Sequence, residues 1–317
     1  MKRKPKRHKR KSSTKLFFLV MIFIFSFFFL ILFGPFSQRW SRQTQLGLLI
    51  GAKDEYLFLV VDPNKETAFI IIFPENMLVD AFGGYGSFKI RNLHGLSSQE
   101  NKPEIFTKSI EYFLGLPVDY WLDYRDKVLP DKNEELPKFV SGLVGRSIFK
   151  RAGTVDMGDW LNIYQLSSFL KGRHLYWQYK DAVDLGLVLK DGDDWVLQKD
   201  DWDRWAQSYL SDPGLKQEGL SLGIYNTTHE KGLAFETARI FSNSGFWVVK
   251  VGNDENDESN CRIELKSSGF LSTKTLERIE KIVDCPVEVV SEDRFLDFTD
   301  INIYLGDEYL SELKKPA

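Results

Sequence analysis

The first long hydrophobic stretch of the chain runs from Leu16 to Phe33, and Ser26 is its only polar residue. A helix rises about 1.5 Å per residue, so this stretch is just long enough to cross the hydrocarbon core of a bilayer. A cleaved signal peptide would have a shorter apolar region followed by a small-x-small site, whereas residues 34–36 read Gly-Pro-Phe. The pattern predicts a transmembrane helix over residues 16–33, with a cleaved signal peptide as the alternative.

Two dense apolar runs follow a predicted linker over residues 34–53. They are Tyr56–Val61 and Ala68–Phe73, and turn-forming residues 62–65 lie between them. This spacing predicts two adjacent β-strands joined by a tight turn. Because both runs are apolar at successive positions, both faces of the strands should be covered, which is typical of a sheet inside an α/β layer.

A helix is predicted over residues 104–114, where apolar residues recur at helical spacing. Pro103 suits its first turn and Gly115 suits its end. A third strand is predicted over residues 118–122. The glycine-rich residues 83–86 lack the Lys-Ser/Thr ending of a phosphate-binding loop, so they predict a hairpin turn instead.

The last part of the chain alternates strand-like and helix-like patterns in the order β-α-β-β-α-β, with one further strand. The predicted strands are residues 220–225, 246–251, 262–265, 287–290 and 301–305, and the predicted helices are residues 230–242 and 272–283. This order suits a small ferredoxin-like α+β unit. The whole pattern predicts a mixed α/β fold, with residues 309–317 as a tail after the last strand.

Charge is distributed unevenly along the chain. Nine of the 42 lysines and arginines lie in residues 1–15, which contain no acidic residue. The remaining 33 basic and 45 acidic residues give the rest of the chain a net charge of −12. By the positive-inside rule, the basic tail stays in the cytoplasm and the large C-terminal portion lies outside the cell membrane. The acidic bulk of the chain argues against nucleic acid as a partner.

The chain contains two cysteines, Cys261 and Cys285. An extracytoplasmic location would permit a disulfide between them, and two buried free thiols are the alternative. Two cysteines are too few for a four-cysteine zinc site, and the four histidines show no i, i+4 pairing. A zinc hydrolase is therefore not supported.

Several segments resemble the LytR-CpsA-Psr family of envelope proteins. Residues 222–234 are similar to the opening of that family's C-terminal domain, and residues 300–307 are similar to its last strand. In the N-terminal half, residues 54–59, Phe73-Pro74, Lys89-Ile90 and residues 115–120 resemble segments of the family's phosphotransferase domain. The resemblance implies a membrane anchor, an α/β sandwich of LytR-CpsA-Psr type over residues 54–215 and a LytR C-terminal domain over residues 219–308.

The chemistry that the resemblance implies is transfer of a glycan from a lipid diphosphate carrier to the cell wall. Arginines would hold the diphosphate, and a carboxylate-bound magnesium ion would offset charge on the leaving group. Asp54 matches the metal-binding carboxylate, Lys89 is retained, and Arg91 could replace a missing arginine. Where the family pattern has Arg-Asp after its proline, this chain has Glu75 and Asn76, and an anion at that position opposes phosphate binding.

Two functions are consistent with these residues. The first is a non-catalytic binding or accessory protein in cell-wall assembly, with the cell membrane, peptidoglycan or polyprenyl-phosphate-linked glycans as partners. The second is an active magnesium-dependent transferase that uses rearranged arginines. The candidate arginines for the second function are Arg91, Arg125, Arg146, Arg151 and Arg173.

Asn226, Thr227 and Gly232 lie where a predicted strand turns into a predicted helix. Since a helix N-terminus offers backbone N–H groups to an anion, these three are candidate ligand-binding residues, and a purely structural turn is the alternative. The aromatic residues between 160 and 209 could stack on sugar rings or could pack in the core.

Overall fold

The computed structural model describes residues 21–22, 44–130, 134–147, 160–172, 175–254, 260–291 and 298–312. The chain divides into two compact units, residues 1–39 and residues 40–317. Met21 and Ile22 are helical, but the rest of the predicted transmembrane helix and the basic tail lie outside the described residues. Within the described ranges, no helix has the length and apolar character needed to cross a membrane.

The first sheet has five strands in the order β6-β1-β2-β3-β7. Its strands are β1 (Leu46–Gly51), β2 (Glu55–Asp62), β3 (Thr67–Pro74), β6 (Tyr120–Asp123) and β7 (Tyr176–Asp181). The central β2 pairs antiparallel with β1 and β3, while β6 and β7 add parallel strands at the edges. The two adjacent strands predicted from their apolar runs are therefore confirmed.

Strand β1 corrects the predicted linker, because residues 46–51 are a fully buried strand. Two glycines obscured it in the sequence pattern, and the structure shows why they are there. A Cβ on Gly47 would lie 2.3 Å from the Pro117 carbonyl oxygen, and one on Gly51 would lie 2.5 Å from the Trp121 ring. Close approach of neighbouring groups, rather than chain flexibility, requires glycine at both positions.

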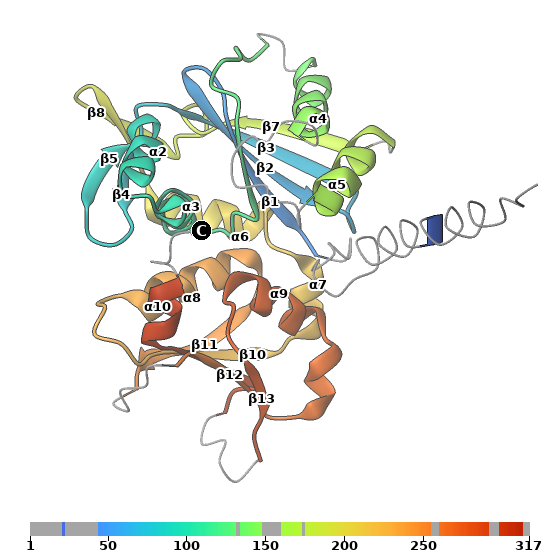
Figure 1. The fold of residues 1–317 in the computed structure, drawn as a ribbon, viewed down its shortest axis with the longest axis vertical. Helices are drawn as coiled ribbons and strands as arrows, with labels where there is room; N and C mark the ends of the chain where they lie inside the picture. The colour runs from blue at the N-terminus through green and yellow to red at the C-terminus, as the bar shows by residue number, and fades with distance from the viewer. Residues whose placement is uncertain are drawn as a thin grey trace, which may run out of the picture. The chain divides into compact units, whose positions relative to one another are not determined.

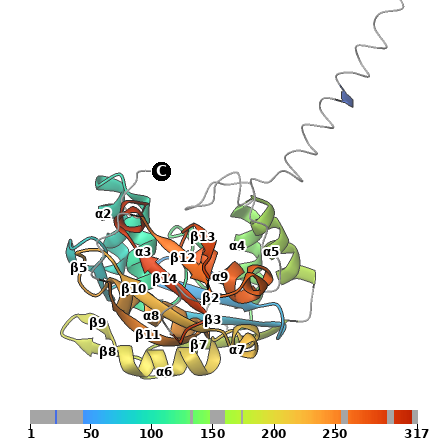
Figure 2. The ribbon, with the colours of Figure 1, turned by 90° about the horizontal axis from the view of Figure 1, so that it is seen from below.

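Helices cover both faces of the first sheet, as Figures 1 and 2 show. One face packs against α4 (Leu136–Ser147) and α5 (Trp160–Gly172). The other face packs against α2 (Ile90–Gln99), α3 (Pro103–Leu114) and α6 (Lys199–Tyr209). The two cores explain why β2 and β3 are apolar at successive positions, and they confirm the predicted α/β sandwich.

Two hairpins pack into the core on the face of the first sheet that α2, α3 and α6 cover. They are β4 (Leu78–Ala81) with β5 (Gly86–Lys89), and β8 (Val188–Asp191) with β9 (Asp194–Leu197). The predicted glycine-rich turn joins β4 to β5 and is confirmed. Helix α3 also matches its prediction, since Pro103 lies in its first turn and Gly115 ends it with a left-handed φ of 58°.

The second sheet has the order β11-β10-β14-β12-β13. Its strands are β10 (Ser221–Asn226), β11 (Trp247–Asn253), β12 (Arg262–Leu265), β13 (Val287–Val289) and β14 (Ile301–Leu305). Helices α8 (Leu233–Ser244) and α9 (Lys274–Ile282) connect strand pairs, and their apolar residues fill the second core. The predicted order of elements is confirmed.

The predicted ferredoxin-like arrangement of these strands is not what the structure shows. In a split β-α-β unit another strand lies between the two strands that a helix connects. Here β10 and β11 are direct parallel neighbours, and so are β12 and β13. The central position belongs to the additional strand β14, whose residues are almost all buried and can therefore fill the middle of the sheet.

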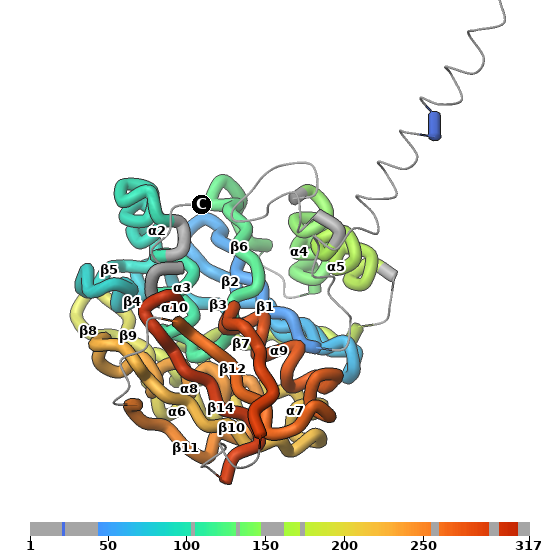
Figure 3. Tube along the Cα trace, turned by 60° about the horizontal axis from the view of Figure 1, so that its bottom comes forward, coloured from blue at the N-terminus to red at the C-terminus, as the bar shows by residue number. Residues whose placement is uncertain are grey.

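Two short helices before and after the second sheet also contribute to the second core. Leu215 of α7 (Pro213–Glu218) and Tyr309 of α10 (Asp307–Glu312) both pack into it, so part of the predicted tail is helical. Figure 3 shows α7 beside α9, where the Glu218 carboxylate accepts hydrogen bonds from two backbone N–H groups that begin α9. A 3₁₀ turn over Ser268–Ser272 precedes α9.

Two buried arginines join the layers around the two sheets. Arg239 of α8 donates to the Asp203 carboxylate of α6 at 2.7 Å and to the Tyr112 and Phe113 carbonyl oxygens at 2.5 and 3.3 Å. Arg278 of α9 donates to both carboxylate oxygens of Asp119 at 2.7 and 3.2 Å. These charge-assisted bonds fix α8 and α9 against the first sheet and its helices.

Candidate functional site

The predicted catalytic residues Asp54 and Arg91 lie at one end of the first sheet, where β1 turns into β2. Asp54 has a left-handed φ of 67°, and its carbonyl oxygen accepts a hydrogen bond from the Glu75 N–H at 3.2 Å. The Glu75 carbonyl in turn accepts from the Arg91 N–H at 3.2 Å. The backbone therefore brings Asp54, Glu75 and Arg91 together although they are distant in sequence.

Two ion pairs occupy this end of the sheet. Arg91 donates to the Glu75 carboxylate at 2.6 Å, and Arg125 donates to the two Asp123 oxygens at 2.6 and 2.9 Å. Arg125 also lies 3.3 Å from Nδ1 of His94. We call Glu75, Arg91, His94, Asp123 and Arg125 the sheet-end cluster.

Charges around the sheet-end cluster perturb several pKa values. Burial raises the pKa of Tyr56 to about 12. Burial alone would raise the pKa of Asp123, but hydrogen bonds and charge from Arg125 hold it below its ordinary value. Burial and the Arg125 guanidinium lower the pKa of His94, so its imidazole is neutral at neutral pH. Burial raises the pKa of Glu55, and the nearby carboxylates of Asp181 and Asp54 raise it further.

The balance of charge decides what the sheet-end cluster can bind. Its two guanidinium groups are matched by the carboxylates of Glu75 and Asp123. With His94 neutral, the site has no net positive charge. A diphosphate would have to displace a carboxylate from an arginine, which opposes tight binding.

Lys89 belongs to a different contact from Arg91. Its Nζ lies 2.6 Å from the Asp194 carboxylate at the start of β9, so this lysine also has an acidic partner. As for a metal site, the described parts of the chain contain no group of three or more His, Cys, Asp or Glu side chains placed to hold an ion. The predicted role of Asp54 as a magnesium ligand stays a prediction.

The predicted ligand-binding residues Asn226 and Thr227 are buried and hold the turn after β10. The Asn226 amide donates to the Glu230 carbonyl at 2.8 Å and accepts from the Thr228 N–H at 2.9 Å. The Thr227 hydroxyl donates to the Leu305 carbonyl at 3.0 Å. These contacts fix the shape of the turn, and the predicted role of the two residues in ligand binding stays a prediction. Gly232 has a φ of 82° and precedes α8, which is why this helix begins later than predicted.

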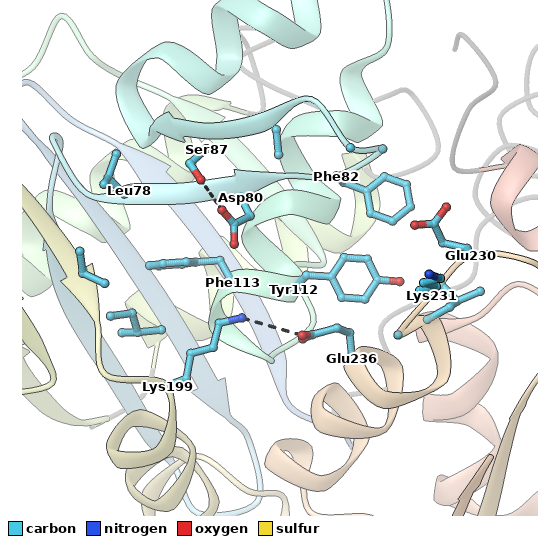
Figure 4. A pocket seen from close by; sticks show the side chains of 17 residues that line it. Leu78, Asp80, Phe82, Ser87, Tyr112, Phe113, Lys199, Glu230, Lys231 and Glu236 are labelled. Atoms are coloured by element: carbon cyan, nitrogen blue, oxygen red, sulfur yellow. Dashed lines mark hydrogen bonds and ion pairs between the residues drawn. The ribbon is translucent and has the colours of Figure 1, made fainter. Parts of the chain in front are cut away.

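Gly232 lines a pocket of about 490 Å³ between the β4–β5 hairpin, α3, the β9–α6 segment and the start of α8. Figure 4 shows rings of Phe82, Tyr112 and Phe113 along its wall, with Leu78 at one end and the charged Glu230 and Lys231 at the other. The Ser87 hydroxyl donates to the Asp80 carboxylate at 2.5 Å, and Lys199 lies 3.8 Å from Glu236. The sequence analysis missed this pocket apart from Gly232.

The remaining candidate arginines and aromatic residues lie elsewhere. Arg146 is exposed at the end of α4, while Arg151 and Arg173 lie outside the described residues. Of the aromatic residues between 160 and 209, Trp202 is fully buried and donates to the Leu114 carbonyl at 2.5 Å. It packs edge-on against Phe73 and beside Trp205, so this part of the interval serves the core.

Cys261 and Cys285 form a disulfide with a Cα–Cα distance of 5.4 Å, which is typical of such bonds. Cys261 precedes β12 and Cys285 precedes β13, which are parallel neighbours in the second sheet. Both residues are buried in the second core. The disulfide therefore supports the fold of the second sheet and lies away from the sheet-end cluster.

Comparison with known proteins gives no matching family model and no match among curated proteins. Solved structures similar to this chain include TagU from B. subtilis, with 9% identity, 51% of this chain and 94% of TagU covered, and a TM-score of 0.34. Lmo1026 from Listeria monocytogenes has 13% identity, with 52% and 95% of the chains covered and a TM-score of 0.34.

A third similar structure is that of TagT from B. subtilis, described as a LytR-CPS2A-psr family protein with bound octaprenyl pyrophosphate lipid. It has 12% identity, with 53% of this chain and 90% of TagT covered, and a TM-score of 0.36. None of these TM-scores is high enough to show a shared fold.

Sequence reasoning missed the partners that neutralise the candidate residues. Asp123 was readable as a carboxylate at the end of a predicted strand, directly after Leu122. Asp194 carried no such signal, because its contact with Lys89 joins two hairpins that are distant in sequence. For the pocket, the available signal was that Leu78, Asp80 and Phe82 occupy every second position, and so one face, of the segment that leads into the glycine-rich turn.

Proposed function

We propose that this chain is a membrane-anchored, extracytoplasmic protein of LytR-CpsA-Psr type that binds lipid-linked envelope glycans without transferring them. The apolar stretch 16–33 and the basic residues 1–15 support the anchor and its orientation. The resemblance of segments in both halves of the chain supports the class of ligand. Peptidoglycan is the second expected partner.

The observation that carries the non-catalytic part is the pairing of Arg91 with Glu75 and of Arg125 with Asp123. Transfer of a glycan from a diphosphate requires cations that stabilise negative charge as it develops on the leaving group. Both arginines at the sheet end already have carboxylate partners. The sheet-end cluster therefore offers a polar surface for a ligand but little electrostatic stabilisation of a transition state.

Isothermal titration of the full-length chain in lipid nanodiscs tests the binding. The ligands are a polyprenyl-diphosphate-linked disaccharide and soluble peptidoglycan fragments. Saturable binding to at least one of them is expected, and absence of binding to both would overturn the proposal. A parallel assay should follow transfer of labelled glycan from the lipid carrier to peptidoglycan, with and without magnesium, and no transfer is expected.

An active magnesium-dependent transferase is the second candidate function. The observation that favours it is the gathering of two guanidinium groups and the Asp54 backbone at one end of the sheet. This function predicts magnesium-dependent transfer that is lost in Arg125→Ala. Arg204→Ala is the matched control, because Arg204 is an exposed arginine on α6 that pairs with Asp201.

A further inference from the structure

The pocket beside Gly232 is built from both sheet regions of the chain. The β4–β5 hairpin and α3 provide one wall, and the residues from Glu230 to Glu236 at the start of α8 provide another. Its volume of about 490 Å³ lies within the range of small-molecule sites. We propose that this pocket binds a neutral sugar unit carrying a small apolar substituent, as in an N-acetylhexosamine.

Flat aromatic faces in the wall are the first reason. The rings of Phe82 and Tyr112 stack with centroids 5.3 Å apart and an interplanar angle of 13°, and both rings are only partly buried. Figure 4 shows both rings in the pocket wall. The apolar face of a sugar ring is complementary to such a surface. The backbone N–H of Phe82 donates to the Ser109 hydroxyl at 2.8 Å, which fixes its position.

Hydrogen-bonding groups around the rings are the second reason. Asp80 and Ser87 lie on the hairpin side, while Glu230 and Lys231 lie on the loop before α8. Carboxylates accept from hydroxyl and amide groups, and ammonium groups donate to hydroxyl oxygens. Asn226 positions the loop, because its amide holds the Glu230 carbonyl at 2.8 Å. The pocket can therefore satisfy several hydroxyl groups of one ring.

The charges select a neutral ligand over a phosphate. Three carboxylates, those of Asp80, Glu230 and Glu236, line the pocket with two lysines, Lys199 and Lys231. Lys199 is also drawn toward Glu236 at 3.8 Å. A diphosphate would meet more negative than positive charge here, whereas an uncharged sugar meets no such repulsion.

An apolar part of the pocket lining is the reason for proposing a sugar with a small apolar substituent. Leu78, Phe113, Leu197 and Leu233 form this part of the lining, and all but Leu78 are buried. The methyl group of an acetamido substituent would remove part of this surface from water, while its N–H could donate to a carboxylate. This inference deepens the proposed function, since such a sugar would be the glycan part of an envelope polymer.

Saturation-transfer NMR and calorimetric titration with the full-length chain in nanodiscs test the pocket. The probes are soluble N-acetylglucosamine and its disaccharide, so the result does not depend on binding of any lipid carrier. Saturable binding is expected, and Phe82→Ala should weaken it about ten-fold. Phe82→Leu keeps an apolar side chain but removes the flat face, so it should also weaken sugar binding. Tyr85→Ala, in the same turn but outside the pocket, should bind as the wild type does.

Three results would overturn the inference. One is unchanged sugar binding in both Phe82 variants. Another is tighter binding of N-acetylglucosamine 1-phosphate than of the neutral sugar, since that would identify a phosphate site. The third is saturable binding of a short-chain alcohol without binding of either saccharide, since that would identify a site for an alkyl chain. Binding of soluble sugar without binding of lipid-linked glycan would refute the proposed function and leave the pocket intact.

Discussion

Arginine side chains pair with carboxylates in two regions of this molecule, and the two regions differ in how deeply these arginines are buried. At the junction between the sheets, the side chains of Arg239 and Arg278 are 7% and 6% exposed. In the sheet-end cluster, the side chains of Arg91 and Arg125 are 45% and 36% exposed. The same pair of groups is thus buried in one region and hydrated in the other.

Burial determines what each pair can do. A buried guanidinium has lost its hydration and depends on every remaining partner, so removal of one partner is costly. An exposed pair contributes little to stability and can exchange its partner for water or a ligand. The comparison indicates that the junction arginines, Arg239 and Arg278, stabilise the packing between the two sheet regions. The charges of the sheet-end arginines, Arg91 and Arg125, are instead neutralised by Glu75 and Asp123.

Arg239→Ala should have the largest effect on stability. It removes the cation from the Asp203 carboxylate, which keeps the Asn243 amide as a donor, and it removes the Arg239 donor from two backbone carbonyls; a broken buried pair costs roughly 3–5 kcal/mol. Urea unfolding of the full-length chain, followed by circular dichroism, measures this loss. Arg204→Ala on α6 is the control, with a side chain 77% exposed and an expected loss below about 1 kcal/mol. Equal losses in the two variants would break the comparison.

The junction also shows where sequence reasoning stops. The strands β2 and β3 and the helix α3 were readable because their apolar pattern is local and nearly uninterrupted. The contact of Arg278 with Asp119 joins α9 to the segment before β6, and no local pattern encodes it. The order of elements in the second sheet was readable, but the central position of β14 depends on pairing between distant strands.

Glu75→Gln should leave the positive charge of Arg91 without its neutralising carboxylate. Arg91 loses its anionic partner, so affinity for inorganic pyrophosphate should rise about five-fold, or roughly 1 kcal/mol. Calorimetric titration at low and moderate salt measures the change, and the gain should shrink as salt screens the charges. Unchanged affinity for pyrophosphate at low salt would contradict the idea that Glu75 neutralises Arg91 and so weakens anion binding.

A matched variant separates this effect from a general change of charge. Glu277→Gln also removes an acidic partner from a cation, since Glu277 pairs with Lys281 on α9, and it should leave pyrophosphate binding unchanged. The resemblance to LytR-CpsA-Psr segments singled out Glu75 as the residue where this chain differs from their Arg-Asp pattern. It could not show that this carboxylate pairs with Arg91, because the pair depends on how β3 meets the start of α2.

Arg91→Ala should change stability only slightly. Its ion pair is exposed, so the free energy of unfolding should fall by less than about 1 kcal/mol. Urea unfolding under the conditions used for Arg239→Ala measures it. A loss as large as that of Arg239→Ala would mean that the sheet-end cluster is architectural and would remove the contrast between the two regions.

His94→Gln should reveal the smallest effect, a dependence of stability on pH. Burial and Arg125 hold the folded-state pKa of His94 below its ordinary value of 6.5. Its contribution to stability is therefore fully present above that value and is lost as the pH falls through the folded-state pKa. The pKa of Asp123 is also lowered, but from 3.8, so Asp123 does not titrate in this window. Thermal unfolding between about pH 7.5 and pH 5 should show the wild type losing stability relative to His94→Gln. Parallel pH profiles would show that the imidazole does not sense the Arg125 guanidinium.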